Sequence, residues 1–279
     1  MEVRFHRSVD EFRAVAEPVY RRDPVAHTIE LTLLRAGTLP GDSLLLTLWH
    51  DGTIFGAALQ TPPYPLAGNM IPIDTVELVA AEVAEARPDL AGIRADRDTA
   101  HAFARAWRDL TGRHGVVELE ERLYRLAELH PPTGVAGATR PAGDGDRAVL
   151  TDWFEQFLVE AFGHPRDDAA GAAFLDEAAV KGDEFVLWDL DGAPVSMAMV
   201  RAPAAGVSRI GPVFTPEDRR GQGFGSAVTA AAARSALDTG VDDVVLFTDL
   251  ANPTSNAIYR RIGFEPVTDF TRVSFRAVD

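Results

Sequence analysis

The sequence contains no cysteine among its 279 residues. Disulfides, thiolate metal sites and cysteine nucleophiles are therefore excluded. The chain has a single lysine, Lys181, so nearly all its positive charge is arginine, dispersed along a chain whose net charge is −15. Nucleic acids and anionic membranes both require a basic surface, so we expect neither as a partner. An acidic protein can still bind a cationic substrate such as an amine.

Long apolar runs are also missing. No stretch approaches the roughly 18 apolar residues of a membrane span, and Met1–Arg13 carries charges throughout, unlike a signal peptide. We expect a soluble, cytoplasmic protein without a membrane partner. The histidines are scattered without the spacing of a metal-binding motif, so we expect no metal site. They are His6, His27, His50, His101, His114, His130 and His164.

The two halves of the sequence share one plan. Asp51-Gly52 and Asp191-Gly192 each separate two β-rich runs, which is the strongest short signal of a hairpin. Before each hairpin stand two helical stretches, and after it come a strand, a helix, a strand and a helix. The helical stretches are Ser8–Arg22, Val25–Ala36, Asp146–Ala161 and Asp168–Lys181. The recurring order favours an internal duplication, and chance similarity of two mixed α/β halves is the alternative.

The halves are expected to meet near residues 130–143, where proline and glycine interrupt both periodicities. We therefore predict domains at 1–133 and 134–279, with Val116–Leu129 as a long strand closing the first. The length suits two domains.

A glycine-rich turn in the second half is typical of an anion site. Val207–Phe214 is predicted as a strand and Gly221–Asp238 as a helix. Between them, glycines at alternate positions remove the Cβ atoms that would keep an anion from the main chain, whose N–H groups are unpaired in the first helical turn. Two arginines at the edge can donate charge-assisted hydrogen bonds. The segment predicts a pyrophosphate site, with Arg219, Arg220, Gly221, Gln222, Gly223, Phe224, Gly225 and Ser226 as its residues.

The alternative to an anion site is a purely structural turn, in which the glycines merely permit a tight strand-to-helix connection. Two nucleotide-binding motifs fit the segment less well. Dinucleotide folds use G-x-G-x-x-G directly after the strand, whereas here the glycines follow a six-residue turn. The triphosphate loop ends in Gly-Lys-Ser/Thr, and the single lysine lies elsewhere.

The segment Arg220–Gly225 resembles the R/Q-x-x-G-x-G/A signature of the GNAT acetyltransferase superfamily, and Asn252–Val267 looks like its second motif. The resemblance implies an α/β (α+β) fold with mixed, mostly antiparallel, splayed sheets flanked by helices, and acetyl-CoA or another short acyl-CoA as the cofactor. It implies that the main chain of Val213, Phe214 and Thr215 binds the pantetheine arm as an added strand. Asn252 and Asn256 are implied as further contacts with that arm.

The same resemblance makes Tyr259 the general acid, because a phenol stays protonated at neutral pH and can give its proton to the departing thiolate. A core aromatic role for Tyr259 is the alternative. The oxyanion is expected to bind a main-chain N–H near Phe214. The general base is left open among Glu160, Asp167, Asp168 and Glu184.

The first half lacks these features. It has no G-x-G between Met70 and Val83, and Trp107 stands at the position of Tyr259. It resembles a degenerate GNAT-like domain, as in tandem members of the superfamily. We therefore predict an acyl-CoA-dependent N-acetyltransferase acting on a small-molecule or peptide amine. A non-catalytic acyl-CoA-binding sensor is the alternative.

Overall fold

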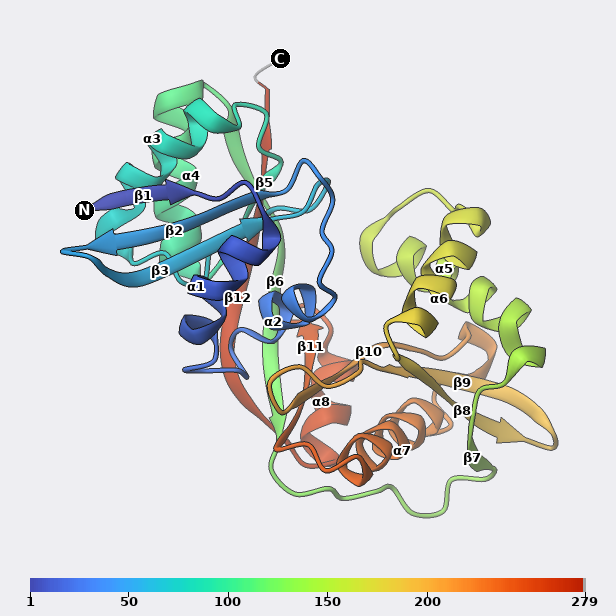
Figure 1. Ribbon diagram of the computed structural model, residues 1–279. Coiled ribbons are helices and arrows are strands. Elements are labelled where there is room, and N and C mark those ends of the chain that lie inside the picture. Colours follow the sequence, from blue (N-terminus) through green and yellow to red (C-terminus); the bar gives the residue numbers. More distant parts are fainter. Residues whose placement is uncertain (278–279) are drawn as a thin grey trace. The chain divides into compact units, whose positions relative to one another are not determined.

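The computed structural model describes residues 1–277, which form two compact units (Figure 1). The first unit contains Met1–Leu123, Thr248–Ala251 and the described residues from Val267 onward. The second contains Tyr124–Phe247 and Asn252–Pro266. The long strands β6 (His114–Leu126), β11 (Asp243–Asp249) and β12 (Phe264–Arg276) therefore contribute residues to both units. The predicted domain division at residues 133 and 134 stays a prediction.

The first unit is a sheet with helices. Its strand order is β1-β2-β3-β4-β5-β12-β6. Strands β4 and β5 are parallel. The other described pairings are antiparallel, and they join β1 with β2, β2 with β3, β3 with β4 and β5 with β12. The remaining elements are β1 (Glu2–Phe5), α1 (Val9–Tyr20), α2 (Thr28–Arg35), β2 (Leu44–His50), β3 (Thr53–Gln60), β4 (Leu66–Ala67), η1 (Ile73–Thr75), α3 (Val76–Ala86), β5 (Gly92–Ala95) and α4 (Arg97–Thr111).

The second unit has the sheet order β11-β10-β9-β8-β7, in which β10 and β11 are parallel and the pairs β7–β8, β8–β9 and β9–β10 are antiparallel. Helices α5 and α6 lie side by side (Figure 1). The remaining elements are β7 (Ala138–Pro141), η2 (Asp144–Asp146), α5 (Arg147–Phe162), α6 (Asp168–Val180), β8 (Glu184–Leu190), β9 (Ala193–Val200), β10 (Val207–Phe214), η3 (Glu217–Arg219), α7 (Phe224–Asp238) and α8 (Pro253–Arg261).

Both predicted hairpins are confirmed, and their turns have the expected geometry. Asp51 and Gly52 have φ of 47° and 76°, and Asp191 and Gly192 have φ of 53° and 80°. Positive φ at both central residues is what a tight two-residue hairpin requires and what Asp-Gly tolerates. The predicted order of two helices, hairpin, strand, helix, strand and helix recurs in the two units, and the predicted class of mixed, mostly antiparallel sheets flanked by helices is confirmed.

Each unit has its own apolar core. In the first, Phe103 and Trp107 of α4 stack on each other and on Phe275 of β12, with ring centroids 5.1 to 6.1 Å apart. In the second, Tyr124, Tyr259 and Phe264 share one cluster and meet edge to face. Such aromatic pairs add stability beyond the area that they bury.

Two local features differ from the sequence-based expectation. Helix α7 begins at Phe224 rather than Gly221, because Gly221 and Gly223 have φ of 78° and 87°, which no right-handed helix allows. Strand β7 lies in the segment expected to be irregular, where Pro141 can end an edge strand. None of the helices within residues 1–277 combines the length and apolar character that a membrane span needs.

Candidate active site

Strands β10 and β11 run parallel and then part. Their paired residues extend from Val207 opposite Asp243 to Ile210 opposite Leu246. β10 continues to Phe214 on its other partner, β9, after a register shift between Ile210 and Val213. Shifts of this kind bend a strand. Among the described residues, the edge of Val213 and Phe214 that faces β11 is therefore without a strand partner, which is the geometry that accepts an extended ligand as an added strand.

The glycine turn that follows β10 has the shape expected of a phosphate site. Gly223 is the N-cap of α7, and the first intrahelical bond joins the N–H of Ala227 to the Gly223 carbonyl at 3.0 Å. The N–H groups of Phe224, Gly225 and Ser226 thus lie outside the helical ladder, at the end where the helix dipole favours an anion.

The space around these glycines fits a bulky anion. A Cβ on Gly221 would have nothing within 4 Å, so this side of the turn is open. A Cβ on Gly223 would meet Val135 at 3.0 Å and one on Gly225 would meet the Thr215 hydroxyl at 3.3 Å, so a side chain would crowd the turn from within. The open side of the turn at Gly221 therefore leaves room for a bulky anion such as a pyrophosphate.

The two arginines of the turn already have acidic neighbours. Arg220 forms an ion pair with Glu160 of α5 at 2.6 Å and donates from Nε to the Thr215 carbonyl at 2.9 Å. Arg219 lies 3.3 Å from Asp218. Both arginine side chains are about half exposed, at 46% of their accessible surface. Exposed ion pairs contribute at most about 1 kcal/mol, so a phosphate can displace these carboxylates.

One predicted asparagine is the N-cap of helix α8 and the other lies within the helix. The Asn252 side-chain oxygen accepts a hydrogen bond from the Ser255 N–H at 3.0 Å and caps the helix, an arrangement that stabilises a helix by about 1 kcal/mol. The Asn256 side chain donates to the Asn252 carbonyl at 2.7 Å and accepts from the Tyr124 hydroxyl at 2.9 Å. Both asparagines are thus oriented by hydrogen bonds before any ligand arrives.

Tyr259 lies on the same helix and is buried, with 9% of its surface exposed. Val213 packs against the apolar cluster to which Tyr259 belongs. Burial raises the pKa of Tyr259 to about 12, and a side-chain hydrogen bond with Ser255 opposes this shift. The phenol therefore keeps its proton throughout the neutral range.

The four carboxylates considered as a general base have other contacts or are exposed. Glu160 pairs with Arg220. Asp167 accepts hydrogen bonds from the N–H groups of Ala169 and Ala170 as the N-cap of α6. Asp168 pairs with Arg166 at 2.7 Å, and Glu184 is exposed at the start of β8.

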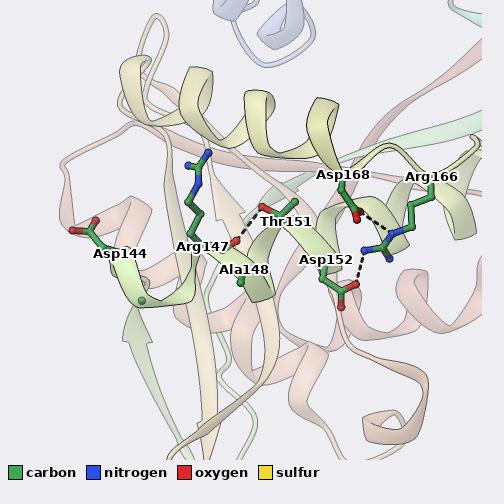
Figure 2. Close-up of a pocket in the computed structure, with 8 residues that line it drawn as sticks. Asp144, Arg147, Ala148, Thr151, Asp152, Arg166 and Asp168 are labelled. Carbon is green, nitrogen blue, oxygen red and sulfur yellow. Dashed lines mark hydrogen bonds and ion pairs between the residues drawn. The ribbon is translucent and has the colours of Figure 1, made fainter.

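A separate open cleft of about 510 Å³ is lined by the first turns of α5 and by residues at the start of α6 (Figure 2). Arg166 bridges Asp152 and Asp168 there, at 2.7 Å from each. The lining residues are Asp144, Gly145, Arg147, Ala148, Thr151, Asp152, Arg166 and Asp168. This cleft includes neither the glycine turn nor Tyr259, so we do not assign the acyl-transfer chemistry to it.

Two residues of the site were missed from the sequence. Tyr124 was included only in a strand of the first half, yet its hydroxyl donates to Asn256 and accepts from Arg260 at 3.2 Å. Ser196 of β9 contacts Phe214 and Thr215. The sequence signal that could have identified Ser196 was a serine at an inward-facing position of an apolar strand. Within residues 1–277, no three acidic or histidine side chains gather as a metal would require.

Sequence comparison finds that part of the chain is similar to a known family. Residues 147–264 match the acetyltransferase (GNAT) family. A mycothiol acetyltransferase of Clavibacter sepedonicus is 27% identical over 275 residues, which cover 90% of this chain and 86% of that protein. A mycothiol acetyltransferase of a Nocardioides species is 25% identical over 241 residues, covering 80% and 81%.

Solved structures of similar fold extend over both units. A GNAT-family acetyltransferase from Colwellia psychrerythraea aligns over 100% of both chains with a TM-score of 0.63 and 12% identity. A tandem GNAT protein from the clavulanic acid biosynthesis pathway aligns over 98% of both chains with a TM-score of 0.62 and 15% identity. At these identities the likeness shows the fold alone, and the predicted tandem arrangement is confirmed at that level.

Proposed function

We propose that this chain, which carries an acetyltransferase domain of the GNAT family at residues 147–264, transfers an acetyl or other short acyl group from acyl-CoA to a primary amine. The observation that carries the proposal is the parting of β10 from β11 next to the glycine turn that opens α7. One ligand that is both extended and doubly phosphorylated satisfies both features.

The binding roles follow from the groups at each position. The main chain of Val213, Phe214 and Thr215 holds the pantetheine arm along the free edge of β10. The N–H groups of Gly221, Gln222, Gly223, Phe224, Gly225 and Ser226 surround the pyrophosphate, with Arg219 and Arg220 turning to it from their carboxylates. Asn252 and Asn256, already fixed by hydrogen bonds, contact the arm from α8.

The chemistry that acyl-CoA supplies is an activated thioester carbonyl. The lone pair of the acceptor amine forms the new C–N bond, the C–S bond breaks, and Tyr259 donates its proton to the leaving sulfur. Main-chain N–H groups near Phe214 stabilise the oxyanion. Asp167 and Asp168 are held by other partners. No contact singles out Glu160 or the exposed Glu184 as a base. We therefore assign the proton lost by the amine to water, which also reprotonates Tyr259.

For residues 1–133 we propose a degenerate copy that keeps the scaffold without the cofactor. The equivalent helix, α3, begins at Val76 after the N-cap Thr75 and has no glycine in its first turn. The acceptor is proposed to be a small molecule with a primary amine. The similar proteins are named for mycothiol, so amines related to mycothiol belong in the first acceptor panel.

The test is a calorimetric titration of acetyl-CoA into the intact protein, followed by measurement of CoA release with that panel. One site per chain and amine-dependent CoA release are the expected results. Absence of binding would refute the proposal. Two sites would refute the degeneracy of the first copy, and binding without turnover of any amine would favour an acyl-CoA sensor.

A further inference from the structure

A buried hydroxyl lies behind the strand end that leads into the glycine turn. Ser196 of β9 has no exposed surface. Its Oγ donates to the Phe214 carbonyl at 2.9 Å and lies 2.8 Å from the Thr215 hydroxyl. A serine hydroxyl has one hydrogen, so the Thr215 hydroxyl supplies the hydrogen of the second bond. Ser196 thus fixes two consecutive residues at the end of β10.

Thr215 in turn contacts the phosphate-binding turn. Its carbonyl accepts from Arg220 Nε at 2.9 Å. Its hydroxyl lies where a Cβ on Gly225 would approach to 3.3 Å, so this side chain closely borders the first turn of α7. The strand end, the arginine and the start of the helix therefore meet at Thr215.

We propose that Ser196 is a positioning residue for the acyl-CoA site. It holds the main chain of Phe214 and Thr215 in the conformation that binds the pantetheine arm and keeps the start of α7 in place for the pyrophosphate. This inference rests on the proposed function. Holding a site in its binding geometry beforehand lowers the cost of ordering it on binding. Without the Ser196 hydroxyl, the Phe214 carbonyl and the Thr215 hydroxyl lose a buried partner, and the strand end can shift.

Ser208 offers a matched control. It is also buried, with 1% of its surface exposed, and donates to a main-chain carbonyl, that of Arg201, at 2.7 Å. It lies in the part of β10 that pairs with β11, opposite Val244. Ser196→Ala and Ser208→Ala therefore remove the same group from equally buried positions, and only the first touches the residues of the proposed cofactor site.

The experiment compares Kd for acetyl-CoA by calorimetry, KM and kcat, and Tm for the two variants. We expect Ser196→Ala to raise Kd and KM for acetyl-CoA about five- to tenfold with kcat within twofold of the wild type. Ser208→Ala should lower Tm comparably and leave Kd within twofold. An unchanged Kd in Ser196→Ala, or an equal rise in Ser208→Ala, would overturn the inference.

Thr215→Val provides a second test should Ser196→Ala not fold. It keeps the shape of Thr215 and replaces its hydroxyl with a methyl group, which cannot form the hydrogen bond to Ser196, so Kd should rise about fivefold. No change in Kd would overturn the inference. Titration of the wild type separates the two hypotheses, because failure of the wild type to bind acetyl-CoA refutes the proposed function, whereas normal binding by the variants refutes only the role of Ser196.

Discussion

The hydroxyl of Tyr259 can be removed with little else changed, which makes it the sharpest test of the chemistry. With a pKa of about 12, the phenol is about three to four units less acidic than a thiol of pKa about 8.5. Complete proton transfer to a free thiolate would cost about 5 kcal/mol, so the proton must move as the C–S bond breaks. We therefore expect a benefit near the lower limit for general acids, and kcat of Tyr259→Phe should fall about a hundredfold.

The assay is release of free CoA, followed with a thiol-reactive dye and the best primary amine from the acceptor panel. The chain contains no cysteine, so the dye does not react with the protein, and with an acceptor that has no thiol it reads only CoA. Kd for acetyl-CoA should change less than twofold. Tyr20→Phe is the control, because Tyr20 is a fully buried tyrosine of the first unit whose pKa burial also raises. A kcat of Tyr259→Phe within threefold of the wild type, or an equal loss in Tyr20→Phe, would refute the acid role.

Three further results are expected. Gly223→Val should raise Kd for acetyl-CoA at least a hundredfold, because it fills the turn and strains a residue at φ 87°; calorimetry would detect any retained binding. In Gly263→Ala the new Cβ would overlap the Glu128 carbonyl, whereas in Gly240→Ala, at a residue that also has positive φ, it would enter open space. Gly263→Ala should therefore lower the free energy of unfolding by at least about 2 kcal/mol more than Gly240→Ala. Equal losses of that free energy in urea unfolding would contradict this. Because burial raises the pKa of Tyr259 to about 12, its protonated phenol contributes to the free energy of unfolding in full below about pH 10, and this contribution, up to about 3 kcal/mol, is lost as pH rises through about 12. The free energy of unfolding of Tyr259→Phe, measured across that pH range, should not show this loss.

Local signals in the sequence predicted most of the fold. Strand β10 was expected at its observed bounds, Val207–Phe214, because a β-rich run between turn residues has few alternatives. The hairpins followed from Asp-Gly alone. Strand β7 was missed because four residues ending in Pro141 have no periodicity of their own and depend on pairing with β8.

The site was predictable where its chemistry is local. The glycine turn and α8 are each a continuous stretch of sequence, so the spacing of their residues identified both. Tyr124 and Ser196 could not be found in that way, because each acts through a tertiary hydrogen bond, to Asn256 or to Phe214. The ion pair between Glu160 and Arg220 likewise forms only in the folded chain. Sequence alone therefore could not distinguish a free carboxylate from a paired one.

The position of strand β12 in the sequence has a consequence for synthesis on the ribosome. Residues Thr271–Ser274 pair with β5, and Phe275 stacks on Trp107 in the core of the first unit. Domains usually fold in the order in which they emerge, but here the first unit lacks an internal strand and part of its core until β12 has been translated. Completion of the first unit must therefore wait until the residues of the second unit that precede β12 have been made.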